Sequence, residues 1–212
     1  IMYAEKNFPD MLDHLSTCMS PMQMLGSLTK GYWAKKVKKI DPKNIVTVAI
    51  MPCTAKKAEK ERPNMKTDEG YKLTDYVLTT RELAKMLKQA NIDPTKLPGT
   101  KFDKVMGEST GAAVIFGVTG GVMEAALRTA YEVITGREVP FKNLNIEPVR
   151  GMEGIREAAI KLENVTEKYK AFEGVTVKVA VAHGPANARK LMEVVKQAKL
   201  AGQPAPWHFI EI

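Results

Sequence analysis

Three residues at intervals of three, Cys53, Lys56 and Glu59, could act together in one small site. A thiol can ligate a metal, an ammonium can donate a charged hydrogen bond, and a carboxylate can exchange a proton. On one helical turn, side chains three positions apart lie on the same side. The alternative is a small apolar cysteine that ends a core strand beside a solvated helix face, because free cysteines are often simply buried.

The residues before Cys53 predict the element that positions it. Ile45–Met51 is apolar without helical periodicity, which is typical of a strand buried on both faces inside a parallel sheet. Met51-Pro52 ends this strand because proline has no N–H to donate. We therefore expect Cys53 just beyond the carboxyl end of a central strand, where open α/β sheets place their ligands.

Two helices are predicted before this strand. Ile1–Leu15 has the apolar spacing of a helix interior. Ser20 is a suitable N-cap and Pro21 a suitable first residue for a second helix, which extends to about Lys38. The many lysines of this region, Lys30 among them, are expected on solvated helix faces.

A glycine-rich stretch, Gly107–Gly121, contains five glycines in fifteen residues and leads into a helix that Gly136 ends. Glycines before a helix can hold a phosphate. This stretch has neither the Walker A nor the dinucleotide-binding pattern, so a nucleotide site has little support. The alternative is close packing of a helix against a sheet.

The rest of the chain predicts an α/β fold. Thr79 and Glu82 form a capping box for a helix that follows a strand at Thr74–Thr79. Further strands are expected at Asn145–Arg150, Ala158–Leu162, Val175–Ala182 and His208–Ile212, with a helix at Pro185–Leu200 that makes the last two strands a βαβ unit. We expect two lobes, approximately 1–120 and 121–212, with mostly parallel sheets flanked by helices around a central cofactor cleft.

Composition narrows the classes of function. No apolar run is long enough to cross a bilayer, which favours a protein without a membrane partner. Two cysteines in 212 residues suit a reducing cytoplasm. The net charge of +8 comes without a recognisable nucleic-acid motif, so we expect no nucleic-acid partner. Ile1 is not an initiator and the last residues are strand-like, which indicates an internal fragment.

Three segments carry a resemblance to a known family. Met51-Pro52-Cys53-x-x-Lys56-x-x-Glu59 resembles the second signature motif of the iron-only (FeFe) hydrogenases. The segment His14–Pro21 is similar to the family's S-T-C/A-x-S-P stretch. Gly107–Arg128 is similar to its G-E-x-x-G-A-x-x-I-F-G-x-T-G-G-V-M-E-A-A-L-R segment almost throughout.

This resemblance implies reversible reduction of protons to dihydrogen at an H-cluster, a 4Fe–4S cubane joined to a di-iron subcluster. It implies that Cys53 ligates the cubane, that Lys56 hydrogen-bonds a cyanide of the di-iron unit with Glu59 beside it, and that Ser16 relays protons. The residues that would surround the cofactor are Met51, Pro52, Ser20, Pro21, Phe116 and Gly117. A ferredoxin or another electron carrier would be the partner.

The chain also departs from the family. The first cysteine motif, T-S-C-C-P-x-W, and the third, M-A-C-x-x-G-C, are absent, so Cys53 is the one ligand cysteine of an expected four. We therefore expect the isolated chain to lack the cofactor and to be inactive. Two other functions stay open: a cysteine-dependent enzyme with Cys53 as nucleophile and His183 as base, and a basic binding module for an acidic redox partner.

Overall fold

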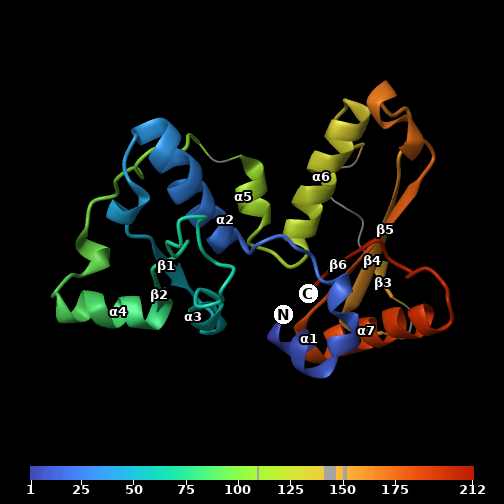
Figure 1. Cartoon of the computed structure of the whole chain (residues 1–212), viewed down its shortest axis with the longest axis horizontal. Helices are drawn as coiled ribbons and strands as arrows, with labels where there is room; N and C mark the ends of the chain where they lie inside the picture. The colour runs from blue at the N-terminus through green and yellow to red at the C-terminus, as the bar shows by residue number, and fades with distance from the viewer. Residues whose placement is uncertain (109, 141–146, 150–151) are drawn as a thin grey trace. The chain divides into compact units, whose positions relative to one another are not determined.

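In a computed structural model that describes residues 1–108, 110–140, 147–149 and 152–212, the chain folds into two units. Unit 1 comprises residues 1–16 and 109–212, and unit 2 comprises Thr17–Glu108. These boundaries differ from the expected 1–120 and 121–212, because residues 1–16 pack with the C-terminal part of the chain. Each unit combines helices with a small sheet (Figure 1), and the predicted α/β class is confirmed.

Unit 1 is built on a four-stranded sheet in the order β3-β4-β5-β6. Its strands are β3 Glu147–Pro148, β4 Ile155–Lys161, β5 Thr176–Ala182 and β6 Phe209–Glu211. β5 and β6 are parallel and α7, Gly184–Leu200, connects them, which confirms the predicted strand–helix–strand order. The β3–β4 and β4–β5 pairs are antiparallel. Part of the strand expected at Asn145–Arg150 lies outside the described residues.

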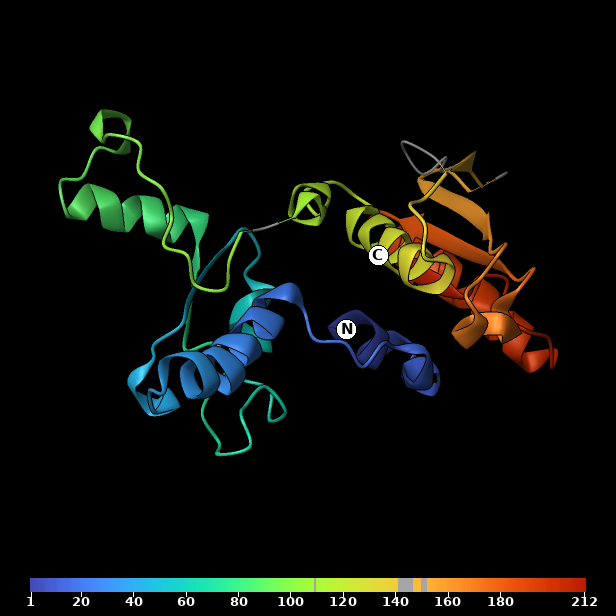
Figure 2. The same ribbon diagram turned by 90° about the horizontal axis from the view of Figure 1, so that it is seen from above.

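Strand β5 faces two separate cores. Ala180 and Ala182 pack with Leu191 and Val195 of α7 and with the N-terminal segment, whereas Val179 and Val181 pack against α6 on the other face. Successive residues of a strand point to opposite faces, so one run of small and β-branched residues supplies both cores. Figure 2 shows α6, Gly121–Thr135, lying along the sheet.

The predicted N-terminal helix is interrupted. α1 covers Met2–Asn7, and a 3₁₀ helix, η1, covers Pro9–His14. A single helix over Ile1–Leu15 was therefore wrong, because Pro9 cannot continue the backbone hydrogen bonds and disfavours helical geometry at Phe8. Phe8 and Met11 are buried against α7.

The other helices of unit 1 flank the glycine-rich stretch and the sheet. α5 covers Gly111–Ile115, α6 follows after a short turn, and η5 covers Glu167–Phe172. α6 ends at Gly136, whose φ of 69° is left-handed, and this confirms the predicted stop.

Unit 2 contains a parallel pair of strands, β1 Val48–Met51 and β2 Tyr76–Thr79. The expectation that β1 is central and buried on both faces was wrong. Val48 is 53% exposed and Ile50 is 39% exposed, because β1 has one strand neighbour among the described residues. The apolar character of Ile45–Met51 does not show how many strands or helices cover this segment in the folded chain.

The helices of unit 2 are α2 Pro21–Ser27, the π-helix η2 Leu28–Lys38, η3 Pro42–Asn44, α3 Ala55–Glu59, α4 Thr80–Gln89 and η4 Pro94–Lys96. α2 lies so close to the chain before β2 that a Cβ on Gly26 would meet the Leu73 carbonyl oxygen at 2.2 Å. The capping box of Thr79 and Glu82 is present at the start of α4, as predicted. In the described part of the chain, no helix combines the length and apolar character that a membrane span requires.

Candidate functional site

Three of the predicted site residues meet at the Glu59 carboxylate. Glu59 and Lys56 lie one turn apart on α3, and Lys56 Nζ is 2.6 Å from Glu59 Oε2. Ser20 caps α2, where its Oγ accepts the Gln23 N–H at 3.5 Å, and the same hydroxyl donates to Glu59 Oε1. The exposed fractions of the Lys56 and Glu59 side chains are 27% and 17%. This cluster, called the Glu59 cluster below, therefore joins two helices that are far apart in sequence.

Cys53 lies between β1 and α3. Its carbonyl oxygen accepts the Lys56 N–H at 3.4 Å, so the backbone that carries the thiol also begins the turn that carries the ammonium. The Cys53 side chain is exposed, as is Pro52, whereas Met51 is half-buried. The alternative that Cys53 is a buried core cysteine was therefore wrong. An exposed thiol can serve as a metal ligand if it loses its proton.

The remaining predicted residues are Pro21, which follows Ser20 in unit 2, and Ser16, Phe116 and Gly117, which belong to unit 1. Pro21 is the exposed first residue of α2, and Ser16 is an exposed residue at the end of the N-terminal part of unit 1. Phe116, 42% exposed, follows the last residue of α5, and Gly117 comes directly after it. Both belong to unit 1.

Unit 1 has a hollow of about 780 Å³ between α5 and α6. Its lining includes Val114, Ile115 and the ion pair that Arg128 makes with Glu124 at 2.6 Å. Phe116 and Gly117 are not among the lining residues. The hollow is therefore not lined by the two residues of unit 1 that we expected to surround the cofactor.

His183 is held within unit 1. It stands at the N-cap position of α7, and its Nδ1 lies 3.3 Å from the Thr119 hydroxyl. Cys53 belongs to unit 2. No described contact joins the thiol to this imidazole, so the nucleophile–base pair stays a prediction.

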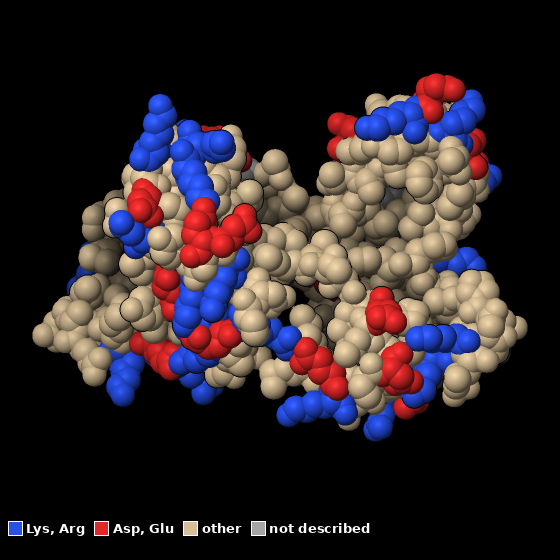
Figure 3. Space-filling model, viewed as in Figure 1, with Lys and Arg blue, Asp and Glu red and all other residues tan. Residues whose placement is uncertain are grey.

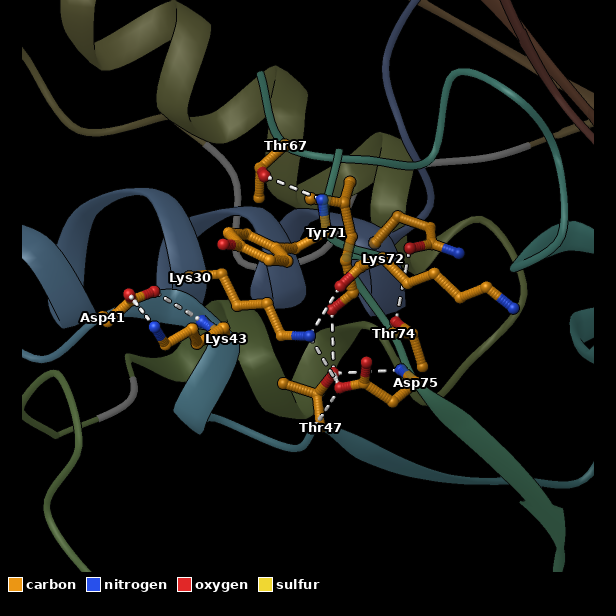
Figure 4. Close-up of polar contacts among 11 residues, drawn as sticks. Lys30, Asp41, Lys43, Thr47, Thr67, Tyr71, Lys72, Thr74 and Asp75 are labelled. Atoms are coloured by element: carbon orange, nitrogen blue, oxygen red, sulfur yellow. Dashed lines mark hydrogen bonds and ion pairs between the residues drawn. The ribbon is translucent and has the colours of Figure 1, made fainter. Parts of the chain in front are cut away.

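A polar network that we did not predict from the sequence lies where β1 and β2 begin. Lys30 was expected on a solvated face, but its side chain is 2% exposed. Figure 4 shows its ammonium between the Lys72 carbonyl oxygen and the Asp75 carboxylate, each at 2.6 Å. Asp75 Oδ2 also accepts from the backbone N–H and the hydroxyl of Thr47, at 2.7 Å and 3.0 Å. Thr47 and Asp75 directly precede β1 and β2, so this network fixes the strands at the end opposite Cys53.

The position of Lys30 has a signal in the sequence. Gly26, Lys30 and Ala34 recur every four residues and are all buried, which marks the inner stripe of the helix. Burial alone raises the pKa of Asp75, but the Lys30 ammonium and the Thr47 donors outweigh it, and the pKa of Asp75 is lowered. Gln23, on the same side, accepts from Thr74 Oγ1 at 3.3 Å, while its buried Nε2 has no partner among the described residues.

The net charge of the chain resides in one unit. Unit 2 contains 18 basic and 10 acidic residues and therefore carries +8, whereas unit 1 contains 14 of each. Figure 3 shows basic side chains interspersed with acidic ones on one face of unit 2. Several are paired: Lys60 and Lys72 hydrogen-bond to Glu61 and lower its pKa to about 2, and Lys57 with the Thr79 N–H lowers the pKa of Glu82 to about 2.

The described residues form no group of three or more His, Cys, Asp or Glu that could hold a metal ion. A cubane iron–sulfur cluster needs about four thiolates. The whole chain contains two cysteines, both exposed. Cys53 and the Glu59 cluster thus fit one side of such a group, and the chain does not supply a full set of ligands.

Comparison with known proteins gives matches along the whole chain. The family model of the iron-only hydrogenase large subunit, C-terminal domain, matches residues 1–212. The periplasmic Fe hydrogenase large subunit of Nitratidesulfovibrio vulgaris is 49% identical over 209 residues, which are 99% of this chain and 45% of that protein. A cytosolic Fe–S cluster assembly factor of Xenopus tropicalis is 27% identical, over 100% of this chain and 42% of the relative.

A solved structure of a variant of the FeFe hydrogenase HydA1 from Chlamydomonas reinhardtii matches with a TM-score of 0.79 and 39% identity. The match covers 99% of this chain and 55% of that chain. This chain thus spans between 33% and 55% of the length of relatives such as these. We inferred a cytoplasmic protein from the small number of cysteines. This expectation was wrong, because the relative at 49% identity is periplasmic.

Proposed function

We propose, since this chain belongs to the family of the iron-only hydrogenase large subunit, C-terminal domain, that it is part of an enzyme that reversibly reduces protons to dihydrogen. The observation that carries this proposal is the meeting of Ser20, Lys56 and Glu59 on the turn that begins at Cys53, whose side chain is exposed. Lys56 and Glu59 belong to the Met-Pro-Cys motif of the family, and Ser20 belongs to its serine-proline stretch. The 27% identity to an Fe–S assembly factor supports that alternative less well than the 49% identity to a hydrogenase supports this one.

The proposed cofactor is an H-cluster, whose cubane and di-iron parts supply the electron transfer and the hydrogen chemistry. Cys53 would hold it with one thiolate. The other ligands would come from parts of a longer protein, because this chain has too few cysteines. The 212-residue chain alone is therefore expected to bind no stoichiometric cluster and to be inactive.

The chain's own residues have separable roles in this proposal. Lys56 presents a charged hydrogen-bond donor, and Glu59 orients it through the 2.6 Å ion pair. Ser20 anchors Glu59 from a second helix. Following the family resemblance, we assign contacts with the cofactor to Met51, Pro52 and Pro21 of unit 2 and to Phe116 and Gly117 of unit 1, and proton relay to Ser16.

Electron transfer requires a carrier, and the charge of unit 2 supports an acidic one such as ferredoxin. A unit with a net charge of +8 attracts an anionic protein, and salt weakens that attraction. In the longer hydrogenase, we expect the KM for reduced ferredoxin to rise at least about fivefold between low salt and ~0.5 M salt. The cationic dye methyl viologen is the control, because its KM should not rise with salt. An unchanged KM for ferredoxin would contradict electrostatic attraction between unit 2 and the carrier.

The two cysteines offer a matched test of the cofactor assignment. Both are exposed, but only Cys53 follows the Met-Pro of the motif. In the longer hydrogenase, assembled without oxygen, Cys53→Ser should lower cubane iron and hydrogen evolution at least about tenfold. Cys18→Ser should leave both near the wild-type values. Equal iron content in the two variants would overturn the role of Cys53. A stoichiometric cluster with activity in the 212-residue chain would contradict the expectation that this chain alone lacks the cofactor.

A further inference from the structure

We propose that Glu211 is a positioning residue that fixes the turn between α5 and α6. One carboxylate oxygen, Oε1, accepts the Gly120 N–H at 3.1 Å, and the other, Oε2, accepts the Met123 N–H at 2.7 Å. These are backbone N–H groups at the start of α6, which the helix itself leaves without partners. The carboxylate comes from about 90 residues further along the chain.

The start of α6 needs such a partner because its own N-cap has no side chain. Gly120 occupies the N-cap position with a left-handed φ of 79°. A serine or aspartate there would cap the helix locally, but an L side chain is disfavoured at this φ. Glu211 replaces the missing local cap and also places a negative charge at the positive end of a 15-residue helix.

The turn has little room to adjust. A Cβ on Gly121 would lie 1.8 Å from the Ile115 carbonyl oxygen, so the first residue of α6 touches the backbone of α5. The Gly121 N–H also donates to the Val118 carbonyl oxygen at 3.0 Å. Glu211 thus closes a turn in which the backbone of both helices is already in contact.

The carboxylate is attached to a rigid support. β6 is parallel to β5, and Glu211 is paired in register with Val181, a buried residue of the sheet. Glu211 itself is half-buried. Glu211 therefore fixes the position of the turn relative to the sheet of unit 1.

This inference rests on the proposed function for its consequence, because the turn begins with Phe116 and Gly117, the proposed pocket residues. Movement of the turn would shift Phe116 and Gly117, so Glu211 would act on the surroundings of the cofactor through these two residues. The same contacts occupy the N-terminus of α6 with a side chain of the protein, so the glycine-rich stretch serves packing rather than phosphate binding.

Amide hydrogen exchange of the chain tests the positioning role without any cofactor. Glu211→Ala should raise the exchange rates of the Gly120 and Met123 amides at least about tenfold, because both lose a charged hydrogen-bond acceptor. Glu211→Gln, which keeps one acceptor oxygen, should give an intermediate increase and serves as the deciding variant if the alanine protein does not fold. Wild-type exchange at both amides in the folded variant would overturn the proposal.

Glu173 supplies the matched control. Its carboxylate accepts two backbone N–H groups, from Asn164 at 2.8 Å and Val165 at 2.9 Å, on another loop of unit 1. Glu173→Ala should accelerate exchange at those two amides and leave Gly120 and Met123 unchanged. Acceleration at Gly120 and Met123 in this control as well would show general loosening of unit 1, which would contradict a specific role for Glu211.

A second measurement tests the consequence for the cofactor. In the assembled longer hydrogenase, Glu211→Gln should shift the infrared bands of the cofactor's cyanide groups, and Glu173→Gln should leave them unchanged. Unshifted bands in Glu211→Gln would overturn the link to the pocket. If the wild-type protein takes up no H-cluster, the proposed function fails, while the exchange experiment still decides the role of Glu211.

Discussion

The Lys56 ammonium lies 2.6 Å from the Glu59 carboxylate, one helical turn away along α3. The other oxygen of the same carboxylate accepts the Ser20 hydroxyl. Glu59 therefore uses both oxygens to hold two groups that the sequence placed in the site. The direction in which Lys56 presents its charge depends on this carboxylate.

Glu59→Gln should reduce hydrogen evolution by the longer hydrogenase about 10- to 100-fold, the usual cost of losing a residue that orients a group beside a metal centre. The amide keeps the shape but loses the charge that holds Lys56. The measurement is the turnover rate at matched iron content. Glu61→Gln is the control, since it also removes a carboxylate paired with lysines, on the exposed surface. Equal activities of the two variants would remove Glu59 from the site.

Ser20→Ala should lower the free energy of unfolding by about 1 kcal/mol, because α2 loses its N-cap. The Ser20–Glu59 contact adds a pairwise term, so the double variant Ser20→Ala/Glu59→Gln should not equal the sum of the two single variants. We expect a coupling energy of about 0.5 kcal/mol or more in urea unfolding. Additive single effects would show that the contact contributes nothing to stability.

The Lys30–Asp75 pair should respond asymmetrically to substitution. Asp75→Asn leaves the fully buried Lys30 ammonium without its counter-charge and should cost about 3 kcal/mol or more. Lys30→Met should cost clearly less, because the Asp75 side chain is 25% exposed and keeps its Thr47 donors. Urea unfolding of unit 2, followed by hydrogen exchange of β1 and β2, measures both. A larger loss in Lys30→Met would contradict this account.

Unit 2 should lose stability in acid. The folded-state pKa of Asp75 is lowered, and the pKa of Glu61 and of Glu82 is about 2, whereas the unfolded values are near 4. Between these values the unfolded chain binds more protons, so the stabilisation is complete above pH ~5 and is lost as the pH falls towards about 2. Thermal melting across this range measures the loss.

Salt separates the contributions to this acid loss. Added salt screens the exposed pairs of Glu61 and Glu82 and should flatten their part of the pH dependence, while the part due to Asp75 persists. Asp75→Asn should remove that remaining part. A pH dependence that salt abolishes entirely would show that the Asp75 network does not contribute.

Much of the local structure follows from short-range patterns. The capping box of Thr79 and Glu82, the end of α6 at Gly136 and the β5–α7–β6 unit are each specified by residues within a few positions of one another. The Ser20 cap and the helical spacing of Lys56 and Glu59 likewise placed two parts of the Glu59 cluster correctly. The contact between Ser20 and Glu59 spans 39 residues, and local pattern does not encode it.

The incorrect predictions have physical causes of the same kind. The apolar run that contains β1 shows which side chains favour burial. Whether they are buried depends on the strands and helices that other segments place over them, and Val48 and Ile50 stay exposed. Lys30 was assigned to solvent by its residue type, although its spacing from Gly26 and Ala34 places it inside. Glu211 went unnoticed because its partners lie about 90 residues earlier in the chain.

The division of unit 1 into two stretches of sequence has a consequence for synthesis on the ribosome. Phe8 and Met11 are buried against Leu191, Val195 and Trp207, which emerge long after them. Unit 2 is continuous and can fold as soon as Glu108 has left the exit tunnel. This core can therefore form around Phe8 and Met11 only after Trp207 has left the exit tunnel.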